Sequence, residues 1–255
     1  MDRIYGGPFA FQWEGLPLEV LSDWVARRGV HGHQLTLAQF VMKKGYIVDR
    51  HSHPNEQITL VLRGALRLDF ETGESCVLHD GEFVVVPPGL VHWGVVLEDT
   101  VDFDAFVPPR SDWWTSSGET YYTTGNREGR TWDSLSHPSP HVGSGTAPQR
   151  VFTWEHLPAE AAGSGIERRS VRGQKQSFSR FVFAAGARYE GTVEAERAVW
   201  VIEGAIRYSV GVEAPATLLA GHCLFIPPNV PLRLEAVETA VCLEVVASPI
   251  ACVTC

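Results

Sequence analysis

The chain contains the same sequence pattern twice. The stretch FQWEGLPLE at residues 11–19 returns as FTWEHLPAE at residues 152–160, an offset of 141. Further matches follow at offsets of 141 and then 140: Gly32 and Gly173, Phe40 and Phe181, Gly45 and Gly186, Gly64 and Gly204, Gly81 and Gly221, and the proline pairs at 87–88 and 227–228. A repeat of this kind in 255 residues predicts two copies of one domain in tandem.

Each copy is predicted to be all-β. Short runs such as LTLAQFVM, ITLVLRGALRLDF, VWVIEGAIRYSV and CLFIPP are rich in β-branched and aromatic residues and are separated by glycine and proline. A closed barrel or a double sheet would protect the edges of such strands. We therefore expect an N-terminal barrel over residues 1–110 and a C-terminal barrel over residues 151–255.

Residues 111–150 are dense in Ser, Thr, Gly and Pro, which indicates a linker, with disorder expected around 136–149. Five aromatic residues in it are too many for free solvent: Trp113, Trp114, Tyr121, Tyr122 and Trp132. They predict that the first part of the linker packs across the two barrels, with a lid over the functional site as the alternative.

Charge and composition exclude several classes of partner. The formal net charge is -9 and no run of Lys or Arg occurs, so nucleic acid is not an expected partner. No apolar run approaches the roughly 20 residues of a membrane span, and the first residues lack the pattern of a secretory signal. Five scattered cysteines suit reduced thiols: Cys76, Cys223, Cys242, Cys252 and Cys255. These features favour a cytoplasmic protein that does not bind membranes.

The stretch RHSHPNEQ, residues 50–57, predicts a metal site. On a strand, residues of equal parity share a face, so His51, His53 and Gln57 would point one way and Glu56 the other. A fourth ligand is expected from His92, which follows the proline-glycine turn PPG. Three imidazoles and an amide oxygen are a ligand set for one divalent ion, and Zn, Ni, Mn and Fe(II) all tolerate it.

The second copy lacks these ligands. The equivalent positions fall near Gly191 or Thr192, Val193 or Glu194, Arg197 or Ala198, and Leu232. We expect this half to be structural, or to bind a ligand without metal. His31 and His33 also have the spacing of ligands, but their place beside glycines favours a loop or the rim of a pocket.

The intervals resemble the motifs of the cupin superfamily. In the first motif Gly45, His51, His53 and Gly64 match, and Gln57 stands where the family has an acid. In the second motif Gly81, Pro87, Gly89 and His92 match, and Val96 replaces a final asparagine. The resemblance extends to both halves and implies a bicupin, two tandem jelly-roll barrels with the ligands inside the first.

A neutral Gln57 leaves all four ligands uncharged, so the ion keeps its full charge as a Lewis acid. A carboxylate would help to stabilise higher-valent iron, and this site has none. The ligand set therefore favours isomerisation, cyclisation or ring opening without net oxidation. A quercetinase-like dioxygenase that uses Fe(II) and O2 is one alternative, and a small-molecule-binding cupin without enzymatic activity is another.

The strand VDFDAFV, residues 101–107, places Asp102, Asp104 and Phe106 on one face, which is either solvated or directed at the site. With HSHPNEQI, the segment is similar to the cupins that linearise 4-deoxy-5-keto-uronates. That resemblance implies Asp104 as general acid or base, Arg110 as the group that grips a substrate carboxylate, and Phe106 in the pocket wall.

His-x-His with glutamine also resembles the bicupin isomerase of bacilysin assembly and the cupin cyclases of aromatic polyketides. Together these features predict a metal-dependent enzyme that acts on a small carbonyl or enolisable metabolite. We expect it to be a monomer or a homodimer.

Overall fold

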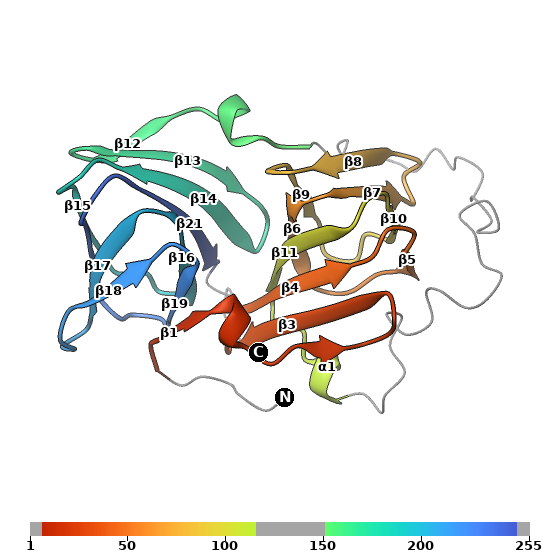
Figure 1. Cartoon of the computed structure of the whole chain (residues 1–255), viewed down its shortest axis with the longest axis horizontal. Coiled ribbons are helices and arrows are strands. Elements are labelled where there is room, and N and C mark those ends of the chain that lie inside the picture. Colours follow the sequence, from red (N-terminus) through yellow and green to blue (C-terminus); the bar gives the residue numbers. More distant parts are fainter. Residues whose placement is uncertain (1–6, 116–150, 249–255) are drawn as a thin grey trace, which may run out of the picture.

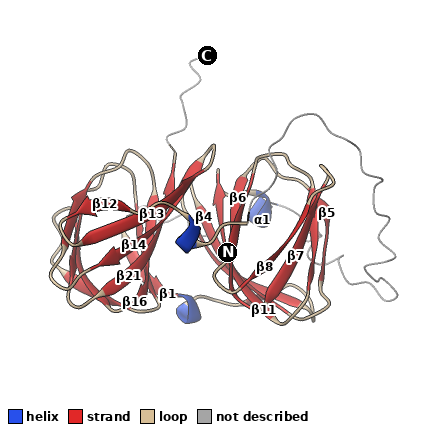
Figure 2. Cartoon of the chain, turned by 90° about the horizontal axis from the view of Figure 1, so that it is seen from above, coloured by secondary structure: helices blue, strands red, loops and turns tan. Residues whose placement is uncertain are grey.

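The computed structural model describes residues 7–115 and 151–248, which form two barrels side by side (Figures 1 and 2). All paired strands in the two barrels are antiparallel. Each barrel has one large sheet that faces the other barrel and one four-stranded sheet on the outside. The prediction of an all-β bicupin is confirmed.

The N-terminal barrel combines a six-stranded and a four-stranded sheet. The six-stranded sheet contains, in spatial order, β2 (Glu19–Val20), β3 (Val25–His31), β4 (Thr36–Met42), β11 (Thr100–Val107), β6 (Glu56–Arg63) and β9 (Phe83–Val86). The four-stranded sheet contains β5 (Ile47–His51), β10 (His92–Val96), β7 (Ala65–Phe70) and β8 (Ser75–His79). A short helix, α1 (Asp112–Thr115), follows β11.

The C-terminal barrel repeats this plan. Its large sheet contains β1 (Phe9–Gln12), β19 (His222–Ile226), β16 (Arg197–Glu203), β21 (Ala240–Ala247), β14 (Gln176–Phe183), β13 (Ile166–Arg172) and β12 (Glu160–Gly163). Its small sheet contains β15 (Arg188–Gly191), β20 (Leu232–Ala236), β17 (Ala205–Val210) and β18 (Ala216–Leu219).

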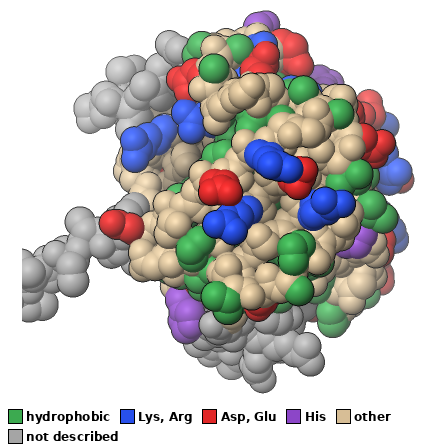
Figure 3. All heavy atoms as spheres, turned by 90° about the vertical axis from the view of Figure 1, so that its left-hand side faces the viewer, with side chains coloured by type: hydrophobic (Ala, Val, Ile, Leu, Met, Phe, Trp, Pro, Cys, Tyr) green, Lys and Arg blue, Asp and Glu red, His purple; other side chains and the backbone are tan. Residues whose placement is uncertain are grey.

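The small sheet of the C-terminal barrel has one apolar and one charged face. Along β20, Leu232 and Leu234 point inward while Arg233 and Glu235 point outward. The outer face carries ion pairs between strands, among them Arg233 with Glu190. Figure 3 shows basic and acidic side chains close together on this side of the molecule. Alternation of this kind is typical of a sheet with one solvated face.

The two halves exchange their first segments. β1 lies in residues 1–110 but pairs with β19 of the C-terminal barrel, where Phe9 lies opposite Phe225. The matching segment of the second copy crosses the other way, because Phe152 forms a β-bridge with Phe83. The predicted domain boundaries, at residues 110 and 151, stay a prediction. The strand pairing crosses these boundaries in both directions.

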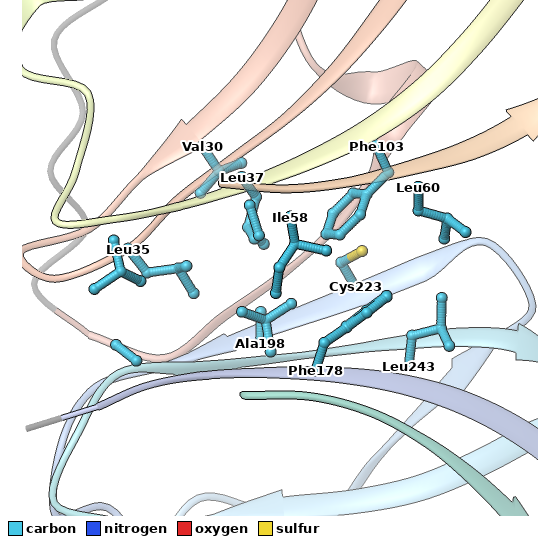
Figure 4. Close-up of a cluster of buried hydrophobic side chains, with 14 of the residues drawn as sticks. Val30, Leu35, Leu37, Ile58, Leu60, Phe103, Phe178, Ala198, Cys223 and Leu243 are labelled. Atoms are coloured by element: carbon cyan, nitrogen blue, oxygen red, sulfur yellow. The ribbon is translucent and has the colours of Figure 1, made fainter. Parts of the chain in front are cut away.

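A shared hydrophobic core joins the two large sheets (Figure 4). Leu37, Ile58 and Phe103 of the first half face Phe178 and Leu243 of the second. Trp13 and Trp154, from short 3-10 helices after the exchanged segments, are buried in the same core. Each barrel also has its own interior core.

Both faces of β11 are buried. Phe103, Ala105 and Val107 pack in the shared core, and the opposite face turns Asp102 and Asp104 into the N-terminal barrel. A solvated Asp face, one of the two readings of the strand pattern, is therefore wrong. The sequence of a half-exposed strand and that of a strand between two cores look alike when one of the cores is polar.

Cys76, Cys223 and Cys242 are free thiols, whereas Cys252 and Cys255 lie outside the described residues. No described helix has the length and apolar character needed to cross a bilayer.

Candidate metal centre

Three histidine side chains meet inside the N-terminal barrel. His51 ends β5, His92 begins β10, and the two lie opposite each other in the antiparallel ladder. His53 lies in the turn that leads to β6. The ring centroids of His51 and His92 are 4.3 Å apart, and one nitrogen of each of the three rings lies within 4.8 Å of the others. Nitrogens at this spacing can bind a single ion.

Backbone carbonyls fix the tautomer of all three rings. Each Nδ1 lies near the carbonyl oxygen of a residue two positions away, at 2.7 Å for His51, 2.9 Å for His53 and 2.9 Å for His92. Because a carbonyl only accepts hydrogen bonds, each Nδ1 carries the proton and donates it. Each neutral ring therefore keeps an unprotonated Nε2, the arrangement typical of metal-binding histidines.

Gln57 at the start of β6 directs its amide oxygen at the same point. Its Oε1 lies 2.9 Å from Nε2 of His53, and its Nε2 donates to Thr59 and Asp104, at 2.8 and 3.2 Å. Two acceptors thus face each other across 2.9 Å, which is unfavourable unless a cation lies between them. The amide dipole is oriented by the two bonds on its other side.

His92 provides the clearest sign of a missing partner. The residue is buried, and its Nε2 has no hydrogen-bond partner among the described residues. A buried polar atom without a partner costs about 1–3 kcal/mol, and native proteins contain few of them. Three Nε2 atoms and one amide oxygen therefore fit a divalent cation, with one or two positions left open for a substrate.

The environment keeps the imidazoles neutral. Burial lowers the pKa of His51 to about 2 and that of His53 to about 4, and it also lowers the pKa of His92. Neighbouring imidazoles and the Arg110 guanidinium lower the pKa of His51 and His53 further. Neutral imidazole is the form that binds metals, so the rings need not lose a proton at neutral pH.

Two acids lie beside the candidate ligands on β11. Asp104 accepts hydrogen bonds at Oδ1 from the Thr59 hydroxyl, at 2.6 Å, and from the Gln57 amide. Burial raises the pKa of Asp104 to about 6, although these two bonds and the charge of Arg110 oppose the shift. Burial and the neighbouring Asp104 raise the pKa of Asp102 well above its usual range. A carboxyl group with a pKa near neutrality suits proton transfer.

A cavity of about 40 Å³ connects the ligands to these acids. His51, Gln57 and His92 line one side, together with Asp102 and Asp104. The remaining wall is mostly apolar: Phe40, Met42, Tyr46, Val48, Leu66 and Leu68, with Thr59. Such a space excludes most water from the acids and holds a group of only a few atoms.

Comparisons with known proteins agree with this architecture. The family model described as "Cupin domain" matches residues 38–106, which include all four candidate ligands and Asp104. Residues 38–106 are a cupin domain, and the chain has the bicupin fold. A comparison with curated protein sequences gives no match.

Solved structures similar to this bicupin include two oxalate decarboxylases. The Lactobacillus farciminis enzyme, in a formate complex, has a TM-score of 0.71 at 16% identity, over 98% of this chain and 88% of that one. A Bacillus subtilis oxalate decarboxylase has a TM-score of 0.70 at 16% identity, over 98% of this chain and 79% of that one. AerE from Microcystis aeruginosa has a TM-score of 0.64 at 17% identity, over 91% and 97%. At such low identity these likenesses show the fold alone.

The sequence-based geometry of the bicupin's ligands needs one correction. His51, His53 and Gln57 do not share one strand, because β5 ends at His51 and β6 begins at Glu56. Residues 52–55 form a turn, and Gly89 N donates to the His53 carbonyl, which ties this turn to the one before His92. The structure nevertheless brings the four predicted ligands together, and Glu56 points away from them as expected.

Phe106 and Arg110 lie beside the ligands rather than free in the cavity. Phe106 packs against His53, at 5.6 Å between ring centroids, and Arg110 stacks on Phe106. The guanidinium of Arg110 is buried and binds Asp112 of α1 through two bonds, at 2.9 and 2.6 Å. A role for Arg110 in substrate binding stays a prediction.

The aromatic residues of the predicted linker are described only in part. Trp113 packs against Phe106 and Phe40 and under the Arg27 guanidinium, all within the N-terminal barrel. Packing of the first part of the linker across the two barrels stays a prediction. The side chain of Trp114, together with Tyr121, Tyr122, Trp132 and the stretch 136–149, lies outside the described residues.

In the second barrel an arginine guanidinium lies where the first barrel has its candidate metal ligands. Gly191 lies opposite Leu232 as His51 lies opposite His92, and Arg197 takes the position of Gln57. The Arg197 side chain is fully buried; its Nη2 donates to the Gly191 carbonyl at 2.8 Å, and its Nη1 lies 3.7 Å from Glu244. Glu244 takes the position of Asp104, so an internal ion pair occupies the equivalent site.

His31 and His33 do not form a second site. His31 is buried, its Nδ1 lies 3.1 Å from the Thr36 hydroxyl, and burial together with the Arg27 charge lowers its pKa to about 4. His33 is exposed in the turn after β3.

The residue most clearly missed by sequence reasoning is Thr59, whose position two residues after Gln57 places it on the same face of β6.

Proposed function

We propose that this bicupin is a divalent-metal-dependent enzyme that moves a proton on a small substrate with a carbonyl or enol oxygen, without net oxidation. The observation that supports it most directly is the convergence of four lone-pair atoms, one of them the unpartnered Nε2 of His92. The raised pKa of Asp104 beside them provides a group for proton transfer.

Nitrogen and amide-oxygen donors without charge are compatible with Mn, Fe(II), Ni or Zn. One of the similar structures, Bacillus subtilis oxalate decarboxylase, is described with Mn(II) centres, which makes Mn a natural first choice. When bound, such an ion polarises a carbonyl oxygen and so lowers the cost of charge that develops on it.

Asp104 is the residue to which we assign proton transfer. Thr59 and Gln57 both donate to Oδ1, and within the described residues Oδ2 makes no hydrogen bond. Oδ2 is therefore the oxygen that would take a proton from the carbon next to the substrate carbonyl. The C–H bond breaks, its electron pair forms the C=C bond of an enolate, and the carbonyl π pair moves to oxygen. In a 2-hydroxy carbonyl substrate the hydroxyl proton then passes to that oxygen, and Asp104 returns its proton to the former carbonyl carbon, so the carbonyl and hydroxyl groups exchange places. Isomerisation of this kind needs no oxidant.

The cavity favours a substrate whose reacting part is small. About 40 Å³ accommodates a carbonyl group and an adjacent carbon beside the ligands, with the remainder of a substrate extending toward the opening. The apolar residues Met42, Tyr46 and Leu68 keep water from competing for the proton. The substrate class proposed is therefore a short 2-oxo or 2-hydroxy acid or an enolisable ketone.

Proton exchange tests this proposal. Protein loaded with Mn(II) would be incubated without oxygen in D2O with a panel of short oxo acids and ketones, and deuterium uptake by the substrate measured by mass spectrometry after protein and metal are removed. We expect exchange with the wild type, loss of exchange in Asp104→Asn with metal still bound, and loss of metal in His92→Ala.

The same experiment separates the alternatives. Turnover that stops without O2 and requires Fe(II) would favour a dioxygenase and contradict our proposal. Ligand binding by the metal-loaded protein with no exchange or conversion of any compound in the panel would favour a binding protein. Wild-type protein that retains no divalent metal after purification in its presence would refute both metal-dependent functions.

A further inference from the structure

The residue before Gln57 connects the metal centre to the other barrel. Glu56 is 1% exposed, and its carboxylate leaves the N-terminal barrel to accept hydrogen bonds from three successive backbone N–H groups of the second half. Those of Lys175 and Gln176 lie 3.0 Å from Oε1, and that of Gln174 bonds to Oε2. Three N–H groups aimed at one carboxylate hold it rigidly in place.

The same contact occurs a second time in the opposite direction. Glu196, the residue equivalent to Glu56, accepts from the backbone N–H groups of His33, Gln34 and Leu35, at 2.7, 2.7 and 3.0 Å. Glu196 is also 1% exposed, so the two contacts match in chemistry and burial. We refer to them as the Glu56 latch (Glu56 with 174–176) and the Glu196 latch (Glu196 with 33–35).

A side chain makes the two latches unequal. Gln176 directs its amide into the N-terminal barrel, where Nε2 donates to the backbone carbonyls of Glu56, at 3.0 Å, and Ala105, at 3.2 Å. The equivalent residue in the other latch is Leu35, because Gly32 N bonds to the Leu35 carbonyl as Gly173 N bonds to that of Gln176. Leucine has no donor at this position. The Glu196 latch has a different side-chain bridge, in which Oε1 of Gln34 accepts from the Glu196 N–H at 2.9 Å. Among the described residues, an amide that donates to the carbonyls of two strands therefore occurs only toward the barrel that holds the candidate metal ligands.

The two carbonyls that Gln176 binds belong to the strands of the site. The Glu56 carbonyl is part of the peptide that leads to Gln57 on β6. The Ala105 carbonyl is part of the peptide between Ala105 and Phe106, one residue beyond Asp104 on β11. Gln57 and Asp104 are joined by a hydrogen bond of 3.2 Å. One side chain of the C-terminal barrel therefore holds the strands that carry a candidate ligand and the candidate acid.

Packing alone does not account for an amide at this position. Gln176 is fully buried, and its Oε1 has no hydrogen-bond partner among the described residues. An unsatisfied buried oxygen is unfavourable, and the fold already accommodates leucine at the equivalent position, where Leu35 is fully buried. The donor group is what distinguishes Gln176 from a leucine here.

We propose that Gln176 and the Glu56 latch are positioning elements through which the metal-free barrel sets the geometry of the metal centre. The inference rests on the metal site of the proposed function. It assigns the C-terminal barrel a role in the chemistry of its neighbour: Gln176 holds β6 and β11 in the register that lets Gln57 face the ion and Asp104 together. Supporting residues of metal sites typically change metal affinity by 10–100-fold when they are removed.

Cobalt(II) binding to the full-length protein tests this inference without a substrate. The absorption spectrum of bound Co(II) reports the ligand geometry, and chelator competition gives its affinity. We expect Gln176→Leu and Glu56→Gln to weaken Co(II) binding about tenfold or more and to shift the visible spectrum. Glu196→Gln is the matched control, because it weakens the equivalent latch on the other barrel. It should lower thermal stability as much as Glu56→Gln does, with affinity and spectrum unchanged.

Several results would overturn the inference. Unchanged affinity and spectrum in Gln176→Leu, with circular dichroism like that of the wild type, would remove the role of the amide. Equal losses of affinity in Glu56→Gln and Glu196→Gln would show that general destabilisation, not positioning, weakens the site. Failure of the wild type to bind Co(II) would refute the proposed function and this inference together, whereas normal wild-type binding with unaffected variants refutes the inference alone.

Discussion

Gln57 combines two tasks that a carboxylate could not combine. Its oxygen faces the Nε2 of His53, and its NH2 group donates to Thr59 and Asp104. A glutamate at this position would lose both donors and place a second negative charge within about 3 Å of Asp104. The amide is therefore as important for the acid as for the ion. The two hydrogen bonds that the amide donates explain why glutamine occupies this position better than the zero charge of the ligand set does alone.

Substitution of Gln57 by glutamate should move the titration of Asp104. The added carboxylate and the lost hydrogen bond both disfavour the ionised form, so the pKa of Asp104 rises. If the ionised form removes the substrate proton, the acidic limb of the kcat/KM profile of Gln57→Glu shifts to higher pH by about one unit or more. Metal affinity should increase, because the new ligand is negative. An unshifted acidic limb would contradict the assignment of Asp104.

Asp102 should make stability depend on pH. Burial raises its pKa in the folded protein above the value in the unfolded chain, so the folded state binds this proton more tightly. The stabilisation is complete below the unfolded pKa of about 3.9 and is lost as pH rises toward the folded pKa. Asp102→Asn removes the free-energy cost of keeping an ionised carboxylate in this buried position. The Oδ1 of the asparagine can still accept a hydrogen bond from Phe40 N.

We therefore expect Asp102→Asn to have a higher unfolding free energy than the wild type at pH 7.5, because the wild type must keep an ionised carboxylate buried or take up a proton. At pH 4 the gain should nearly vanish. Urea denaturation of metal-free protein at both pH values measures this difference. Asp23→Asn, at an exposed position, should be neutral at both. Equal stability of Asp102→Asn and wild type at pH 7.5 would show that burial does not raise this pKa.

At the scale of elements, the two latches explain a pair of repeated glycines. A Cβ on Gly32 would lie 2.3 Å from Oε2 of Glu196, and a Cβ on Gly173 would lie 2.3 Å from Oε1 of Glu56. No real contact is so short, so each carboxylate would have to leave its N–H groups. Close approach of a side chain is the reason that both turns contain glycine at this position.

Alanine at either glycine should break one latch. We expect Gly32→Ala and Gly173→Ala each to lower the free energy of unfolding by about 2–4 kcal/mol, because a buried carboxylate loses its charge-assisted hydrogen bonds. Thermal and urea denaturation check this. Gly15→Ala, with nothing within 4 Å of its added Cβ, should change stability little. Wild-type stability in both latch variants would contradict the reading of these turns.

Some features of these elements could be predicted from the sequence, and others could not. Repeated glycines and prolines predicted two equivalent barrels, and alternation along 101–107 placed Asp102 and Asp104 on one face. The break between β5 and β6 was missed, although Pro54 and Asn55 are turn residues. The exchange of β1 could not be predicted, because FQWE and FTWE have the same spacing whichever barrel each joins. Only long-range pairing, which a single sequence does not encode locally, decides between the two.

In the whole molecule, the exchange of the first segments of the two halves makes the folding of each barrel depend on the other. The N-terminal barrel takes Phe152 against Phe83, the C-terminal barrel takes β1 against β19, and the core between them draws residues from both. A half produced alone would expose that core and lose its exchanged segment. Exposure of so much apolar surface is costly at roughly 25 cal/mol per Å².

Fragments 1–110 and 151–255, produced separately, should therefore fail to fold as independent units. We expect each to lack a cooperative thermal transition, and the two mixed in equal amounts to regain the far-ultraviolet circular dichroism and the melting transition of the full chain. Co(II) binding should return only in the mixture, because the ligands lie in the first fragment and the residues that hold β6 and β11 lie in the second. A first fragment that melts cooperatively and binds Co(II) with wild-type affinity by itself would show that the metal centre needs no contribution from its twin.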